Sequence, residues 1–77
     1  MDRDLPRLGE VWRHFKNKNC KIINIAIHTE TKEKLVIYRA MYDNMSIYAM
    51  PLDMFMSEID HEQYPEITQK FRFEKIS

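Results

Sequence analysis

The stretch Cys20–Tyr42, CKIINIAIHTETKEKLVIYRAMY, predicts two antiparallel β-strands joined by a short polar loop. Apolar side chains alternate with others over residues 20–29 and again over residues 35–42, which is the period of a half-buried strand. The residues between these two runs are all polar. Because antiparallel neighbours need only a short connection, we expect this hairpin to form the centre of the fold.

The pairing register of this hairpin decides which residues form the core. If the loop has three residues, Thr29 pairs with Glu33, and His28 lies on the same face as Tyr38 and Tyr42. The opposite face then gathers aliphatic side chains, namely Ile23, Ile25, Ile27, Leu35, Ile37 and Met41. A loop of two or four residues would invert the faces of one strand, because successive side chains point to opposite sides. We favour the three-residue loop, since it separates aliphatic from aromatic and polar positions more cleanly.

The rest of the chain predicts three further strands and one short helix. The expected strands are residues 9–15, 46–50 and about 70–76. Turns are expected at Asn17-Lys18-Asn19 and at Asp43-Asn44. Pro51 suits the start of a helix, and apolar residues follow it at helical spacing. The prediction is a mainly β fold: a small, bent antiparallel sheet or half-open barrel of about five strands, with one short helix near residues 51–59.

Length and composition narrow the class of protein. With 77 residues, of which 44% are hydrophobic and 31% charged, the chain is predicted to form a single domain over residues 1–77. No apolar run approaches the roughly 20 residues that cross a bilayer, and the N-terminal residues lack the apolar segment of a secretory signal. The lone Cys20 has no partner for an internal disulfide. We therefore expect a cytoplasmic protein that makes no membrane contact.

Charge is unevenly distributed along the chain, although the formal net charge is zero. Residues 13–21 form a basic strip that contains no acid, with the cations Arg13, Lys16, Lys18 and Lys21. Between Arg39 and Lys70 there are six acids and no base. The strip is suited to contact an anion, an acidic partner or the acidic half of a second copy, whereas a solvated charged face is the simpler interpretation. We expect a monomer or a weak homodimer.

Four separately spaced motifs resemble those of a known family. They are Trp12-Arg13-His14-Phe15-Lys16, Ala26-x-His28-Thr29-Glu30-Thr31, Leu35-Val36-x-Tyr38-x-Ala40-Met41-Tyr42 and Pro51-Leu52-x-Met54-Phe55. Together they are similar to the bacterial domain of unknown function 1653, with a family-like core over residues 9–59. The resemblance implies a small SH3-like β domain without an established activity. The chain departs from the family pattern at positions where members commonly carry Gly, Tyr and Arg, which here are Asn17, Cys20 and Met50.

Aromatic and histidine side chains form the candidate binding surface. Its residues are Trp12, His14, His28, Glu30, Tyr38, Tyr42 and Tyr48. Aromatic side chains on a small barrel can grip a peptide or stack on bases, but the same face can also be the barrel interior, with the tyrosine hydroxyls reaching solvent. We expect a non-catalytic binding module for a peptide, a protein partner or a small ligand. The alternative is a nucleic-acid accessory domain, in which the basic strip contacts phosphates and the tyrosines stack on bases.

Catalysis and metal binding are less favoured. His28 and Glu30 would point the same way on an extended strand and, with His14, resemble an acid–base pair or a metal site. However, the chain contains no H-x-H, C-x-x-C or H-E-x-x-H motif, and hydrogen bonds within the sheet and turn explain these residues more simply. Cys20 stands where the family has an aromatic residue, which indicates a packing role. We therefore expect no catalytic residue, no metal and no cofactor.

Overall fold

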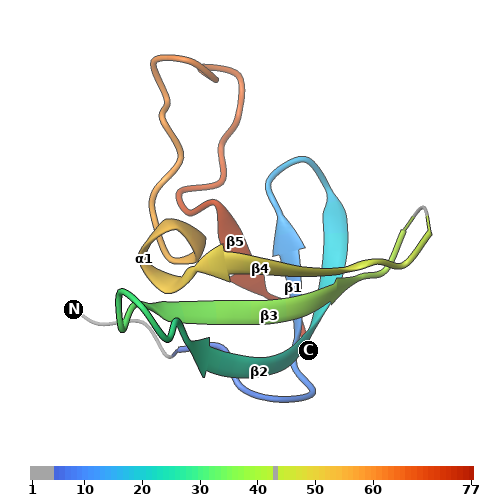
Figure 1. Ribbon diagram of the computed structural model, residues 1–77. Helices are drawn as coiled ribbons and strands as arrows, with labels where there is room; N and C mark the ends of the chain where they lie inside the picture. The colour runs from blue at the N-terminus through green and yellow to red at the C-terminus, as the bar shows by residue number, and fades with distance from the viewer. Residues whose placement is uncertain (1–4, 43) are drawn as a thin grey trace.

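The computed structural model describes residues 5–42 and 44–77, and it shows one antiparallel sheet of five strands with one short helix (Figure 1). The elements are β1 (Val11–His14), β2 (Lys18–Ile27), β3 (Lys34–Ala40), β4 (Ile47–Pro51), α1 (Leu52–Phe55) and β5 (Phe73–Lys75). Their spatial order, β4-β3-β2-β1-β5, leaves β4 and β5 as the two edges, so the described strands do not close into a barrel. The predicted mainly β fold is confirmed, with a helix shorter than the expected 51–59. Within the described residues, no helix has the length and apolar character needed to span a membrane.

Residues 28–33 connect β2 to β3, and their last hydrogen-bonded pair encloses four residues, so the prediction of a three-residue loop was wrong. The His28 N–H donates to the Glu33 carbonyl at 2.8 Å, so four residues lie between this pair. Lys32, the last residue of these four, has a φ of 64°, which lies in the left-handed region of the backbone. The register therefore slips by one residue, and Ile25 lies opposite Val36. The polar composition of the loop did not reveal its length.

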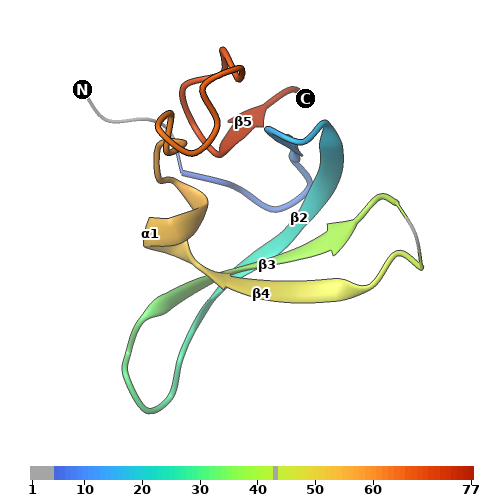
Figure 2. The ribbon, with the colours of Figure 1, turned by 90° about the horizontal axis from the view of Figure 1, so that it is seen from above.

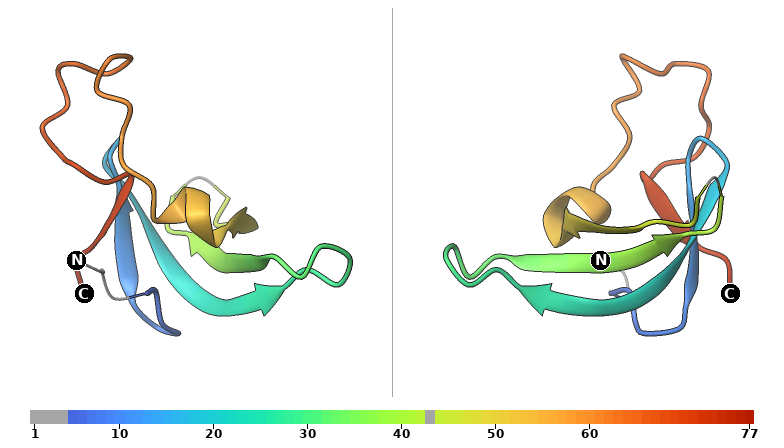
Figure 3. Two further views of the ribbon diagram at one scale, coloured as in Figure 1. Left: turned by 90° about the vertical axis from the view of Figure 1, so that its left-hand side faces the viewer. Right: turned by 45° about the vertical axis from the view of Figure 1, so that its right-hand side comes forward.

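A β-bulge in β2 changes the register a second time. The pairing shifts between Ile22 and Asn24, which leaves Ile23 as an extra residue on β2. Bulges bend a strand and increase its twist, and Figure 3 shows β2 curving away from β1 toward β3. As a result Ile22 is 1% exposed, whereas Ile27 at the far end of the strand is 60% exposed.

The core is largely aromatic. Its cluster of buried residues consists of Trp12, Cys20, Ile22, Val36, Tyr38, Phe55 and Phe73. The ring of Phe55 stacks on Phe73, with centroids 4.1 Å apart, and meets Trp12 edge-on at 5.4 Å. No member of the expected aliphatic face is among the buried core residues, and Ile25 is only packed against them. Part of the face that was predicted as a binding surface is therefore core.

Two connections, the β1–β2 turn and the loop from α1 to β5, lie close together at one side of the sheet. Residues 15–17 form the turn between β1 and β2, two residues earlier than the expected 17–19, and Asn17 adopts a φ of 67°. Residues 56–72 form a long loop between α1 and β5 that projects from the sheet (Figures 1 and 3). Its Tyr64 ring lies 5.0 Å from the ring of Phe15 in the turn. Asp43, expected in the turn before β4, lies outside the described residues.

Candidate ligand pocket

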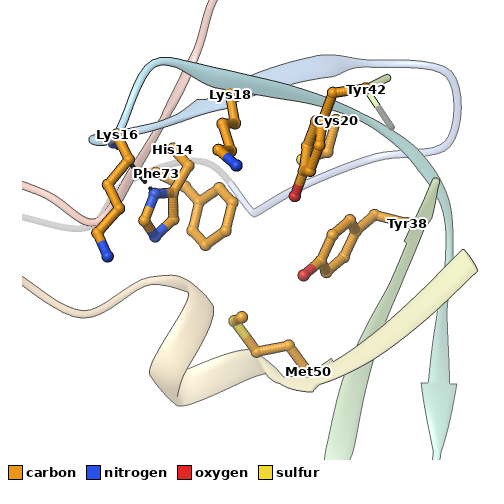
Figure 4. Close-up of a pocket in the computed structure, with 8 residues that line it drawn as sticks. All are labelled: His14, Lys16, Lys18, Cys20, Tyr38, Tyr42, Met50 and Phe73. Atoms are coloured by element: carbon orange, nitrogen blue, oxygen red, sulfur yellow. Dashed lines mark hydrogen bonds between the residues drawn. The ribbon is translucent and has the colours of Figure 1, made fainter. Parts of the chain in front are cut away.

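A pocket opens where the β1–β2 hairpin faces β3, β4 and β5 (Figure 4). Its volume is about 200 Å³, and it is lined by His14, Lys16, Lys18, Cys20, Tyr38, Tyr42, Met50 and Phe73. Three of these residues, Cys20, Tyr38 and Phe73, also belong to the core cluster. The pocket is thus built directly on the hydrophobic core.

The hairpin between β1 and β2 positions the basic side of the pocket. His14 and Lys18 are paired across the hairpin, so their side chains share a face, and Lys16 lies in the turn between them. On the other side of β1, His14 is paired with Phe73 of β5. This double pairing brings a residue from the C-terminal end of the chain beside the hairpin.

His14 is held as a neutral imidazole. Its ring packs edge-on against Phe73 at 4.9 Å, and its Nδ1 accepts a hydrogen bond from the Lys16 backbone N–H at 3.1 Å. Burial lowers the pKa of His14, repulsion by Arg72, Lys16 and Lys18 adds to this effect, and together they bring the pKa to about 4. Because Nδ1 accepts, the proton of the neutral ring resides on Nε2. In Figure 4 the second ring nitrogen faces the space between Lys16 and Met50.

Two tyrosines form another wall of the pocket. Tyr38 is 8% exposed, and burial raises the pKa of its hydroxyl, which therefore stays protonated at neutral pH. Figure 4 shows that this hydroxyl points into the pocket, and it makes no hydrogen bond with residues 5–42 or 44–77. Tyr42 lies beneath the Lys18 ammonium group, which is 4.8 Å from the centre of its ring.

Cys20 contributes an apolar wall. The residue is 1% exposed, and burial raises the pKa of its thiol to about 11. A thiol with such a pKa stays protonated at pH 7, and the thiolate is the form that attacks electrophiles or binds metals. Among the described residues, no three His, Cys, Asp or Glu side chains come together in a way that would hold a metal ion.

The structure brings together some residues of the predicted surface and separates others. His14, Tyr38 and Tyr42 line the pocket, and Tyr48 lies beside it, 47% exposed and 5.8 Å from Tyr38 between ring centres. Trp12 is a core residue, 2% exposed, whose indole N–H donates to the Glu10 carboxylate at 3.0 Å. That hydrogen bond satisfies the one polar atom of the side chain, and Trp12 is not among the residues that line the pocket.

His28 and Glu30 lie at the opposite end of β2, in the hairpin loop that reaches away from β1 and β5 (Figure 2). There the Nδ1 of His28 accepts hydrogen bonds from the backbone N–H groups of Glu30 and Thr31, at 3.1 and 3.3 Å. The ring therefore organises the loop. His14 lies in the other hairpin, so the three residues do not form an acid–base pair or a metal site in this structure.

The basic strip is divided between the two faces of the sheet. Lys16 and Lys18 line the pocket. Arg13 and Lys21 occupy alternate positions, paired with Asn19 and Val11, and their side chains point to the opposite face.

Sequence reasoning missed three pocket residues. Phe73 enters through the pairing of β5 with β1, Met50 lies on β4, and Cys20 faces the pocket from β2. Phe73 lies within the last expected strand, about residues 70–76, but no local signal placed it beside His14.

The protein is therefore a small β domain with one sheet, a short helix and an open pocket built on an aromatic core. The family model described as "Protein of unknown function (DUF1653)" matches residues 10–75, so the chain belongs to this family. The match extends beyond the expected core of residues 9–59 and includes β5. No curated protein and no solved structure matches the chain. The family description states no activity.

Proposed function

We propose that this protein is a small non-catalytic binding module whose pocket holds a small ligand. The observation that supports this proposal is the pocket itself, which combines the polar groups of His14, Tyr38 and Tyr42 with the apolar side chains of Met50 and Phe73. Concave sites that combine an apolar lining with a few placed polar groups are typical of ligand binding. Pockets for drug-sized molecules enclose about 300–1,000 Å³. A volume of about 200 Å³ instead suits a group about the size of a single ring.

The core position of part of the lining supports a preformed site. Cys20, Tyr38 and Phe73 are at most 8% exposed and are held by the packing of several elements. A ligand that binds here does not have to order these side chains first, which removes part of the entropic cost of association.

The alternative function as a nucleic-acid accessory domain has less support. A phosphate backbone is contacted by cations along one continuous surface. Here Lys16 and Lys18 lie in the pocket, whereas Arg13 and Lys21 are on the opposite face. We therefore favour a small ligand over nucleic acid. We further predict that the domain is SH3-like and acts in the bacterial cytoplasm. We predict a monomer or a weak homodimer.

A fragment screen with a pocket-filling variant tests the proposal. Single-ring fragments are titrated into ¹⁵N-labelled protein, and the amide signals that shift are assigned. We expect shifts at His14, Lys18 and Tyr38, and we expect Met50→Trp to weaken binding at least about tenfold, because the larger side chain occupies the pocket. Met54→Trp is the matched control, since Met54 is 50% exposed on α1 and does not line the pocket.

Dispersed amide spectra show that both variants are folded. The proposal is wrong if no fragment shifts the pocket signals. Equal binding by the Met50→Trp protein and the native protein would also contradict it.

A further inference from the structure

The polar atoms that face the pocket are suited to donate hydrogen bonds. The ammonium groups of Lys16 and Lys18 can only donate. His14 donates through Nε2, because its Nδ1 already accepts the backbone N–H of Lys16. The Tyr38 hydroxyl keeps its proton and has no hydrogen-bond partner within the described residues. A ligand that fits these groups must supply acceptors.

The charge of the lining is entirely positive. Lys16 and Lys18 are its charged members, and no Asp or Glu among residues 5–42 and 44–77 contributes to it. Neither lysine forms an ion pair with another described residue, since the ion pair found there joins Lys75 to Glu10. The two ammonium groups therefore create a positive potential that the pocket itself does not neutralise.

Aromatic rings, and not carboxylates, hold the two lysines in place. The Lys18 Nζ lies 4.8 Å from the centre of the Tyr42 ring, and the Lys16 Nζ lies 5.8 Å from that of Tyr64 and 5.9 Å from that of Phe15. A cation over the face of an aromatic ring is attracted by the ring but keeps its charge available to a third group. The aromatic rings therefore orient the two ammonium groups without neutralising their charge, so both groups can still bind an anion.

From this geometry we infer that the pocket binds a small oxyanion, a carboxylate or phosphate group carried on an aromatic or aliphatic group. The oxyanion accepts hydrogen bonds from the two lysines and from His14 Nε2, while the apolar part lies against Phe73 and Met50. The inference deepens the proposed function and rests on it. Charge-assisted hydrogen bonds of this kind are stronger than neutral ones, so an anion should bind more tightly than a neutral molecule of the same shape.

Three ligands of similar shape test the charge preference: benzoate, phenyl phosphate and benzamide, each titrated into ¹⁵N-labelled protein at low salt. We expect at least one anion to bind about tenfold or more tightly than benzamide, as one added charge-assisted hydrogen bond would give. The difference should shrink as salt is added, because part of the site is open to solvent. Comparison of benzoate with phenyl phosphate identifies the preferred oxyanion.

Two double variants with the same change in net charge locate the effect. Lys16→Gln/Lys18→Gln should lower the affinity for the anions to that for benzamide. Arg13→Gln/Lys21→Gln removes the same charge from the opposite face and should leave the preference unchanged.

The outcomes separate this inference from the proposed function. If benzamide shifts the pocket signals and binds as tightly as both anions, the pocket is a ligand site but the oxyanion inference is wrong. If the opposite-face variant loses the preference as fully as the pocket variant, the effect is one of net charge, and the inference is again overturned. If none of the three ligands shifts the pocket signals while other neutral fragments do, only the oxyanion inference fails; if no fragment does, both fail.

Discussion

Substitution of Phe55 by Ala should remove a large part of the stability of this protein. Phe55 is the buried residue of α1, with an exposed fraction of 0%. Its ring lies between Phe73 at 4.1 Å, Trp12 at 5.4 Å and Tyr38 at 6.2 Å between centroids. These three rings lie on β5, β1 and β3. Truncation of Phe55 would therefore leave a cavity between α1 and three strands.

The magnitude follows from the burial and the chain length. Replacement of a buried Phe by Ala costs about 3–5 kcal/mol, through lost transfer free energy and the cavity left behind. A chain of 77 residues has a total free energy of unfolding of roughly 4–12 kcal/mol, at about 0.05–0.15 kcal/mol per residue. The loss is thus a large part of the total. Met54→Ala on the same helix should change stability by less than about 0.5 kcal/mol, because Met54 is 50% exposed.

Urea denaturation followed by the fluorescence of Trp12, the single tryptophan, measures both values by linear extrapolation. Phe55→Leu retains part of the side chain and should fall between Phe55→Ala and the native protein, which keeps the series measurable if the alanine variant is largely unfolded. A loss below about 1 kcal/mol for Phe55→Ala would refute the reasoning, since that value is typical of an average site. An equal loss for Met54→Ala would show that α1 is not docked through Phe55.

Three further predictions test the site and the register. Burial lowers the pKa of His14 to about 4 from an ordinary 6.5, so the unfolded chain binds this proton more readily and stability should fall as the pH drops from about 6.5 toward 4. Urea titrations at pH 7 and pH 5 should show a smaller loss for His14→Gln than for the native protein, and an identical loss would contradict the assignment. The buried Cys20 thiol, with its pKa raised to about 11, should react with iodoacetamide far more slowly in the native protein than in urea; equal rates would show that it is accessible. Ile22→Ala should cost about 2–5 kcal/mol and Ile27→Ala less than about 0.5 kcal/mol, measured by urea denaturation. The register with a three-residue loop predicts the reverse order.

Local patterns in the sequence correctly predicted the strands, the start of the helix and the left-handed residue of the first turn. Alternating apolar residues indicated all five strands, and Pro51 marked the position at which α1 begins. Asn17 was expected to suit a left-handed turn, and it adopts a φ of 67° between β1 and β2. Trp12 and His14 are alternate residues of the first expected strand, which puts them on one face, and their pairing with Cys20 and Lys18 agrees with this.

The same patterns failed where pairing between strands decides the outcome. The bulge shifts the alternation of side chains by one residue, but Ile22 and Ile23 are both apolar, so the hydrophobic pattern did not show where the shift occurs. The bulge and the four-residue loop together place Ile22 in the core and expose Ile27, against the predicted aliphatic face. A one-residue error in register inverts every side chain of a strand, so the predicted core was wrong although the strands were right.

The sequence by itself determined the fold class, the family and the side chains available for binding, because these depend on residue types and on spacing along the chain. Only the tertiary structure decided which of those side chains meet. His14 is brought beside Phe73 by the pairing of β1 with β5, while Trp12 is drawn into the core and His28 is left in a distant loop. These placements depend on contacts between segments far apart in the chain, which no local pattern encodes. The donor-lined pocket is the product of that packing.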